Sequence, residues 1–265
     1  MSNMVIPLLR NEIAKAVRTK LPYFGFLVIS ILCVLIFIVT GSILDSENLN
    51  AWGYTSLSMQ LIFTDIGLIF IAVFASMLIA EETAFGTARV VLSCPVLRWE
   101  FYAAKVLTGL LYAAAMSVIS LIVSTCLGSW NYEFGDVADS MGMIYSNKEV
   151  LVNFLMAFFL SWIPLAALVM YGIFISTIVR RSGQAVAVTI GTIYLIDFTK
   201  HIVGIDSYIF TKYIGFSWQV FNQVTQGVDY QWRPQVWYMI AMSLVYCFVL
   251  FAAGLAIFSR RDING

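Results

Sequence analysis

The stretch from Glu81 to Lys105 gathers charged side chains between two long apolar regions. Its adjacent glutamates, Glu81 and Glu82, are of a type that can activate water in hydrolytic enzymes. Burying six charges in hydrocarbon would cost roughly 15–20 kcal/mol, at about 2.5–3.5 kcal/mol for each. We therefore expect the stretch in water or among lipid headgroups, between two membrane spans. The six charged residues are Glu81, Glu82, Arg89, Arg98, Glu100 and Lys105.

The residues needed for hydrolysis are missing from the rest of the chain. In outline, the two glutamates resemble the glutamate pair of intramembrane CAAX-type proteases, which place an arginine close by and use histidines on other spans. Here Arg89 lies seven residues beyond Glu82, and His201 is the single histidine. No GxSxG, HExxH or GxxxxGK[ST] motif occurs. We therefore predict no catalytic, cofactor-binding or metal-binding residue in this chain.

Asp197 and His201 form a second polar candidate. Their i, i+4 spacing puts them on one helical face if the helix continues that far. Ionisable groups at membrane depth are often functional, so the two could form a proton-sensitive pair in the outer leaflet. The alternative is that both lie at the outer interface in contact with water.

The composition defines the elements that position these residues. The chain has 265 residues, of which 61% are hydrophobic and only 11% charged, and its net charge is zero. These values indicate an all-α polytopic membrane protein with a single transmembrane domain over 1–265, and they imply no nucleic-acid partner. The elements we expect are an interfacial helix at 4–20, spans at 21–44, 61–80, 106–127, 150–179, 185–198 and 237–258, a charged segment at 81–101, and a re-entrant segment at 202–221.

Three of these segments have features beyond hydropathy. The segment 4–20 combines an apolar stripe with four basic residues, which is typical of a helix lying in the membrane plane. The span 106–127 contains Gly109 and three successive alanines, which predict close packing on a neighbouring helix. The apolar run 185–198 is short and is followed by an aromatic stretch, so we expect 202–221 to dip back without crossing.

The basic residues orient the six predicted spans. Most of the 15 lysines and arginines fall on the side that holds both termini and the segment 81–101. By the positive-inside rule this side is cytoplasmic. The basic residues predicted on the opposite side are Lys148, Lys200, Lys212 and Arg233.

Within the charged segment, apolar residues recur with helical spacing. They are Ala84, Phe85, Ala88, Val91 and Leu92, and Pro95 follows one turn later. This pattern predicts one short amphipathic helix over 83–94 that lies across the surface of the protein.

The same segment resembles the cytoplasmic loop of ABC-2 type transporter permeases. That family has a glutamate followed after three residues by Gly-Thr, then an L-S-x-P-V-S-R stretch and a lysine. Leu97 stands where the family often has serine, and the ending Phe258 to Ile263 resembles the F-x-R-x-D-I close of many members. The matching residues are Glu82, Gly86, Thr87, Arg89, Leu92, Ser93, Pro95, Val96, Arg98, Phe101 and Lys105.

The resemblance implies one permease subunit of an exporter in the bacterial cytoplasmic membrane. A second permease, identical or related, would complete the pore, and two separate ATP-binding subunits would carry ATP and Mg²⁺. The 83–94 helix would couple to those subunits. The resemblance also implies an amphiphilic cargo, such as an antimicrobial peptide, a drug or a lipid-like molecule. The implied coupling residues are Glu82, Phe85, Gly86, Thr87, Arg89, Pro95 and Arg98.

Two other functions are weaker interpretations of the sequence. A secondary transporter driven by an ion gradient would have inverted repeats and carboxylates at mid-membrane, but no clear repeat is present and Asp65 and Asp197 lie near the ends of their spans. An intramembrane enzyme would need further histidines.

Overall fold

The computed structural model describes residues 4–43, 50–93, 96–139, 142–228 and 232–260, and most of them are helical. The helices are α1 (Val5–Arg18), α2 (Leu21–Ile43), α3 (Ala51–Leu61), α4 (Gly67–Ala84), α5 (Thr87–Leu92), α6 (Arg98–Asn131), α7 (Asn147–Ile178), α8 (Ser182–Val203), α9 (Phe216–Thr225) and α10 (Arg233–Arg260). The shorter elements are the π-helical turn η1 (Ile62–Ile66), the 3₁₀ turns η2 (Asp206–Tyr208) and η3 (Phe210–Tyr213), and the strands β1 (Val137–Asp139) and β2 (Gly142–Tyr145).

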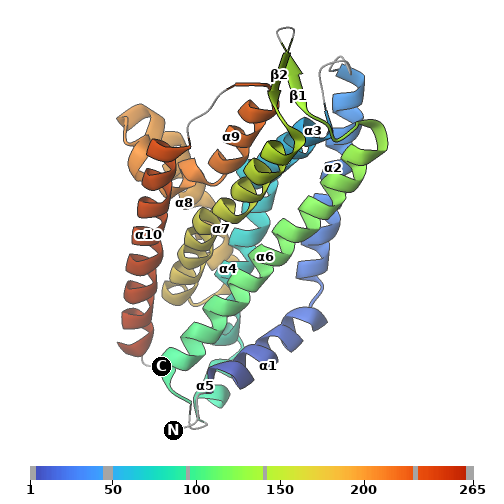
Figure 1. Cartoon of the computed structure of the whole chain (residues 1–265). Coiled ribbons are helices and arrows are strands. Elements are labelled where there is room, and N and C mark those ends of the chain that lie inside the picture. Colours follow the sequence, from blue (N-terminus) through green and yellow to red (C-terminus); the bar gives the residue numbers. More distant parts are fainter. Residues whose placement is uncertain (1–3, 44–49, 94–95, 140–141, 229–231, 261–265) are drawn as a thin grey trace.

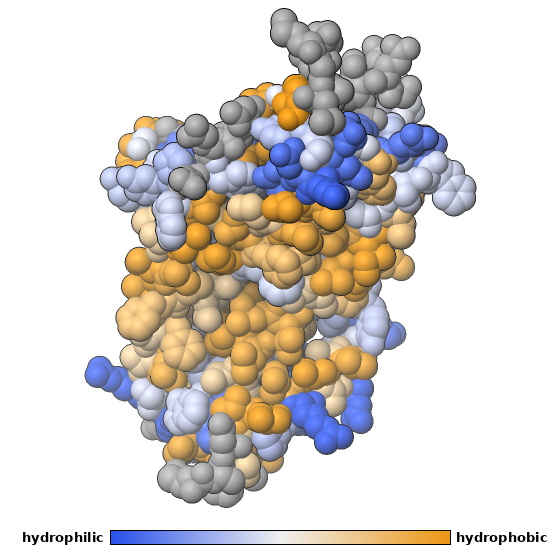
Figure 2. Space-filling view, viewed as in Figure 1, coloured by the Kyte–Doolittle hydropathy of each residue, from blue (hydrophilic) through white to orange (hydrophobic). Residues whose placement is uncertain are grey.

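Five helices of the described chain are long and apolar enough to cross a membrane: Leu21–Ser42, Ala51–Ala84, Arg98–Asn131, Asn147–Ile178 and Pro234–Arg260. Figure 2 shows the matching surface, an apolar belt between two polar ends. The belt requires a lipid environment because large apolar side chains are exposed along it in the part of the chain that the structure describes. The protein is therefore an integral, polytopic membrane protein, as the composition predicts.

Helix α8 contains the short apolar run 185–198 but is not among these five helices. It leads the chain from the end that holds both termini to the end that holds α9 and the strands (Figure 1). Ala185, Thr189 and Ile193 are buried at intervals of four residues, so α8 packs along one stripe and leaves its other faces exposed.

The helix of the second predicted span begins at Ala51, ten residues before the expected start of 61–80. Residues 51–60 are polar enough to suggest a loop, but most are buried, and four of them make hydrogen bonds to other segments. Their helix is stable because these partners replace water. The Trp52 ring N–H donates to the Asn147 side chain at 3.1 Å. The Tyr54 hydroxyl donates to the Cys33 carbonyl at 2.9 Å. The Ser56 hydroxyl donates to the Asn222 side chain at 3.2 Å.

A small antiparallel hairpin is the exception to the all-α prediction. Strands β1 and β2 pair Val137 with Tyr145 at the end of the molecule opposite both termini (Figure 1). Alternation of apolar and polar residues over so few positions gives little signal in a sequence, so the pattern of this acidic segment does not indicate a hairpin.

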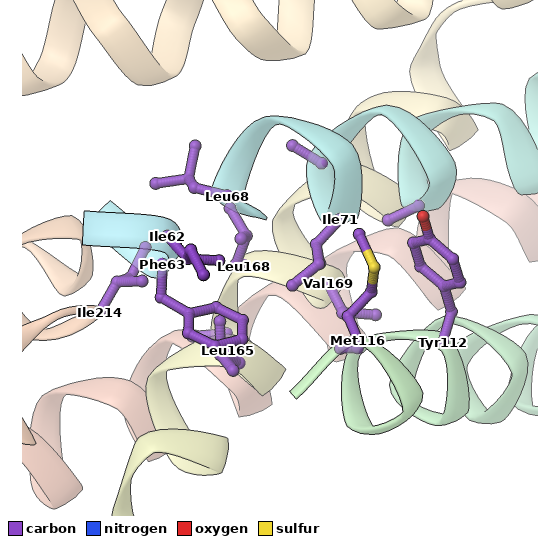
Figure 3. Packing of buried hydrophobic residues seen from close by; sticks show 14 of the residues in the cluster. Ile62, Phe63, Leu68, Ile71, Tyr112, Met116, Leu165, Leu168, Val169 and Ile214 are labelled. Carbon is purple, nitrogen blue, oxygen red and sulfur yellow. The ribbon is translucent and has the colours of Figure 1, made fainter. Parts of the chain in front are cut away.

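Helices α4 and α7 form the centre of the bundle. In the most apolar stretches, 61% of residues are buried in α7 and 56% in Ala51–Ala84, against 11% in α10. A Cβ on Gly172 of α7 would lie 2.7 Å from the Cβ of Ala75, so the absence of a side chain allows the two backbones to approach. Figure 3 shows Ile71 of α4, Met116 of α6 and Val169 of α7 in this core.

The small residues of α6 pack as expected. A Cβ on Gly109 would lie 2.7 Å from Cγ1 of Val169, and Ala113 is buried. The prediction that this face contacts a neighbouring helix is therefore confirmed, with α7 as the neighbour.

The segment predicted to be re-entrant folds as η2, η3 and the start of α9. Its side chains are inserted between α3 and α7: Trp218 and Phe221 are fully buried, and each lies within 6 Å of the Phe154 ring centroid. Its position relative to the lipid stays a prediction.

Candidate functional site: the junction of α1, α4, α5 and α6

The single amphipathic helix predicted over 83–94 is wrong, because Gly86 divides it. Gly86 has φ +71°, a left-handed conformation that glycine adopts without steric cost. Helix α4 ends at Ala84, with the Phe85 N–H donating to the Glu81 carbonyl at 3.0 Å, and α5 begins at Thr87. Phe85 therefore belongs to a turn rather than to the helical face that carries Ala88.

The apolar residues of this segment face two ways. Ala88 is buried, whereas Phe85 is 75% exposed and Val90 is 68% exposed. We call Phe85 and Val90 the apolar tip. Val90 lies in α5 and Phe85 in the turn before it, and α5 lies at the end of the molecule that holds the two termini (Figure 1).

Four charged side chains lie behind the apolar tip. Glu12 and Lys15 come from α1, Glu82 from α4 and Lys105 from α6, and we call them the charged junction. Lys105 Nζ donates to Glu12 Oε2 at 2.5 Å and to Glu82 Oε1 at 2.7 Å. Lys15 Nζ donates to Glu82 Oε1 at 2.5 Å and to Glu12 Oε1 at 2.9 Å. Three helices far apart in sequence are thereby joined at one point.

The charged junction is largely shielded from water. Lys105 is only 2% exposed, and Glu12 and Glu82 are each 7% exposed. Lys105 Nζ also lies 5.3 Å from the centroid of the Phe101 ring, on which it makes a cation–π contact. Buried charges are tolerated when they are neutralised and hydrogen-bonded, which the two lysines and two carboxylates do for each other.

Lys15 is the exposed member, with 43% of its side chain accessible. Burial opposes its charge, but hydrogen bonds to Glu82 and Glu12 and the attraction of both carboxylates outweigh that effect and raise the pKa of Lys15. A pKa raised on folding contributes stability that is present at neutral pH and is lost only as the pH rises through the raised pKa, above 10.5. Lys15 is therefore charged under physiological conditions.

Two further contacts connect the start of α6 to its surroundings. Glu100 accepts from the backbone N–H of Met4 and of Leu97, both at 3.1 Å, and so ties the start of α1 to α6. Arg98 donates to the carbonyl of Ser259 at 2.6 Å and to that of Phe258 at 3.3 Å. These carbonyls lie at the C-terminal end of α10, where a cation is favoured.

A groove of about 600 Å³ runs beside the charged junction, between α1 and the turn that carries Phe85. Its lining combines the exposed tip with the junction, including Lys15, Glu82, Phe85 and Val90. Among the residues that the structure describes, no hydrogen-bond partner is present for Glu82 Oε2. The groove thus has both an apolar wall and charged groups, as a protein-binding surface does.

The coupling residues predicted from the sequence fall into distinct positions. Phe85 is exposed, Gly86 forms the turn, and the Thr87 hydroxyl donates to the Glu82 carbonyl at 3.4 Å. Glu82 is buried inside the junction, where its Oε1 accepts from Lys15 and Lys105, and its role in coupling stays a prediction. The backbone of Arg89 lies in α5 but its side chain is not described, and Pro95 lies outside the described residues.

At the other end of the molecule, Asp197 is bonded to residues that the sequence did not single out. Its carboxylate accepts from the Lys200 ammonium and, at 3.3 Å, from the Thr211 hydroxyl. The side chain of His201 is not described, so the Asp197–His201 pair stays a prediction. The i, i+3 spacing of Asp197 and Lys200 was a readable signal for the observed ion pair.

The arrangement defines a class of protein: a polytopic helical membrane protein with an apolar tip on a rigid, charged junction at one polar end. A family model described as "ABC-2 family transporter protein" matches residues 8–199. The chain is also similar to "Uncharacterized protein YhcI" of Bacillus subtilis (strain 168), with 26% identity over 232 residues that cover 85% of this chain and 73% of that protein. The chain therefore belongs to the ABC-2 family of transporter proteins, and it is a membrane transport component.

Proposed function

We propose that this chain is the permease subunit of an ATP-driven ABC-2 exporter of the bacterial cytoplasmic membrane. Separate subunits bind ATP and Mg²⁺ and dock on the apolar tip, and a second permease subunit completes the translocation path. The cargo is an amphiphilic molecule of the peptide, drug or lipid-like class. Membership of the ABC-2 family supports this assignment, since such permeases generally work with an ATP-binding subunit and another permease.

The observation that carries the proposal is the exposed Phe85 on a turn backed by the buried charged junction. An aromatic side chain held on a rigid support is the usual anchor of a protein interface, because little conformational freedom is lost on binding. The junction links α1, α4 and α6, and α5 follows α4 directly after the turn at Gly86, so a force applied at the tip would be passed to these helices together. Stimulation of the partner's ATP hydrolysis in vesicles is the experiment that tests this function.

The proposal places six crossings in the membrane, with α8 as the fifth and both termini in the cytoplasm. The 22 residues of α8 span about 33 Å at 1.5 Å per residue, which is sufficient for a ~30 Å hydrocarbon core. Its polar residues lower its mean hydropathy, and contact of its exposed faces with a second subunit would accommodate them.

Cysteine labelling tests this topology. Gly135 and Gly183 lie at opposite ends of the molecule, and a Cβ on either meets no heavy atom within 4 Å, so Gly135→Cys and Gly183→Cys are both accommodated. In a cysteine-free background, an impermeant maleimide should label Gly135→Cys on intact cells and Gly183→Cys only after lysis. The reverse pattern, or labelling of both from outside, contradicts the orientation.

We place the second permease subunit on the face formed by η1 and α8. Asp65 of η1 is exposed, and the Tyr194 hydroxyl is within electrostatic reach of Asp65 and Asp197. Asp65 lies roughly 25 Å along the helix from Glu82, and because this helix begins at Ala51 and not at residue 61, we place Asp65 within the membrane and not near the end of its span as the sequence suggests. A carboxylate in contact with lipid there would cost up to about 3 kcal/mol, a penalty that a protein partner and a polar path remove.

Photo-cross-linking tests this placement. Tyr194 is 47% exposed on α8 and Phe248 is 75% exposed on α10, so benzoylphenylalanine can replace either ring without filling the core. Irradiation of membranes should give a covalent protein adduct from position 194 and none from position 248, whose surroundings are lipid. An adduct from 248 alone would move the second subunit to the other side of the bundle.

A further inference from the structure

A pocket of about 440 Å³ opens at the end opposite both termini, between η2, η3 and the start of α10. Its size is within the range of small-molecule sites. Three tyrosines, a phenylalanine and a methionine account for five of its eight lining residues, and one lysine supplies its charge. The residues on which the argument depends are Tyr208, Lys212, Tyr213, Phe216, Gln235 and Tyr238.

The floor of the pocket is fixed and its walls are open. Tyr213 is 5% exposed, its hydroxyl donates to the Ser207 carbonyl at 2.7 Å, and its ring lies perpendicular to that of Phe216. Tyr208 of η2 and Tyr238 of α10, which also line the pocket, are 67% and 66% exposed. A ligand can therefore enter from outside and meet a surface that is already ordered.

Lys212 determines the sign of the ligand. Its side chain is exposed, and no carboxylate within the described residues lies at ion-pair distance from it, whereas neighbouring Lys200 is neutralised by Asp197. Aromatic walls alone would suit a ligand with a quaternary ammonium group through cation–π contacts. The positive charge of Lys212 in the same pocket would repel such a ligand. An anion with an apolar body satisfies both the lysine and the rings.

The position of the pocket identifies the source of that anion. Exposed Tyr208 and Tyr238 line it and exposed Trp237 is next to Tyr238 in the chain, and tyrosine and tryptophan concentrate at the level of lipid headgroups. The predominantly aromatic wall continues into Met242 on the membrane side of α10, where acyl carbons would lie. A small anion without an apolar body, such as inorganic phosphate, would gain nothing from this apolar wall.

We propose that this pocket binds an anionic phospholipid of the outer leaflet, with its phosphate on Lys212 and its glycerol and upper acyl carbons against the aromatic wall. The bound lipid would hold η3 to the start of α10. The assignment to the outer leaflet rests on the topology given in the proposed function. The binding of the lipid to the pocket does not depend on coupling to ATP.

Lipid binding to the purified full chain tests the site, measured by native mass spectrometry with phosphatidylglycerol and phosphatidylcholine of identical acyl chains. Wild type should prefer phosphatidylglycerol. Lys212→Gln should weaken phosphatidylglycerol binding about fivefold, the effect of one basic side chain at a membrane surface, and leave phosphatidylcholine unchanged. Lys148→Gln is the matched control, since Lys148 is exposed at the same end but outside the pocket, and it should behave as wild type.

Two further measurements separate the alternatives. Tyr238→Ala should weaken the binding of both lipids and leave the unfolding midpoint of the protein unchanged, because the exposed ring contacts the ligand and contributes little to the fold. Added inorganic phosphate should not displace phosphatidylglycerol. The proposal is overturned if Lys212→Gln retains wild-type binding, if Lys148→Gln loses as much, if Tyr238→Ala binds both lipids normally, or if phosphate competes.

Discussion

Phe85→Asp is expected to weaken binding of the ATP-binding subunit by at least about thirtyfold. Phe85 is 75% exposed, so it contributes little to the fold, and its ring is free to insert into a partner. A central aromatic anchor is worth about 2 kcal/mol or more, and a carboxylate placed in its pocket would also be desolvated. Because 1.4 kcal/mol is tenfold in affinity, 2 kcal/mol corresponds to the stated loss.

The measurement is the dissociation constant between the purified chain in nanodiscs and its ATP-binding subunit. Trp130→Asp is the control, because Trp130 is 84% exposed but lies at the other end of the molecule. It should leave affinity unchanged, and both variants should insert into the membrane normally. Equal affinity of wild type and Phe85→Asp would exclude the apolar tip from the interface.

Lys105→Met is expected to lower the free energy of unfolding by about 3–5 kcal/mol. It removes a side chain that is 2% exposed and leaves the buried carboxylates of Glu12 and Glu82 with Lys15 alone. Removal of one partner from a buried ion pair has this cost because the remaining charge is uncompensated. Lys15→Met removes a lysine from the same junction, but its side chain is 43% exposed, so solvent limits the loss to about 1 kcal/mol or less.

Unfolding in mixed micelles measures both variants, and a double variant isolates the charge effect. Glu82→Gln combined with Lys105→Met restores neutrality and leaves the Glu12–Lys15 pair. Its loss in free energy of unfolding should therefore be smaller than the sum of the losses of Glu82→Gln alone and Lys105→Met alone. Equal losses in free energy of unfolding for Lys105→Met and Lys15→Met would contradict a buried junction. So would a loss in the double variant equal to the sum of the losses of Glu82→Gln and Lys105→Met.

The helical, polytopic membrane character of the chain was predictable because it depends on local composition. Apolar runs identify the helices, and the glutamate, glycine and threonine spacing around Gly86 marks the segment that the fold places at a polar end. The break at Gly86 was also within reach, since a glycine at the end of a helix commonly adopts the left-handed conformation.

The charged junction was not predictable, because its members are distant in sequence and individually ordinary. Glu12 and Lys105 are 93 residues apart, and each is a typical charge beside a membrane span. Lys15 and Lys105 count equally in the positive-inside rule, yet one is half exposed and the other buried. Only tertiary packing distinguishes Lys105, which is buried where three helices join, from a lysine such as Lys15 that is partly exposed.

Residues 51–60 illustrate a similar limit at the other end. Trp52, Tyr54 and Ser56 carry polar groups that hydropathy assigns to water, but their partners are on three other segments. Propensity along the chain contains no information about those partners. The resulting helix is longer than the span that hydropathy defines.

The most direct test is ATP hydrolysis in vesicles that hold the ATP-binding subunit with or without this chain. Wild-type chain should raise the hydrolysis rate, and the Phe85→Asp chain should not, at subunit concentrations where Trp130→Asp still does. Hydrolysis that is indifferent to the chain would contradict the proposal, and so would movement of cargo by the chain alone in vesicles without nucleotide.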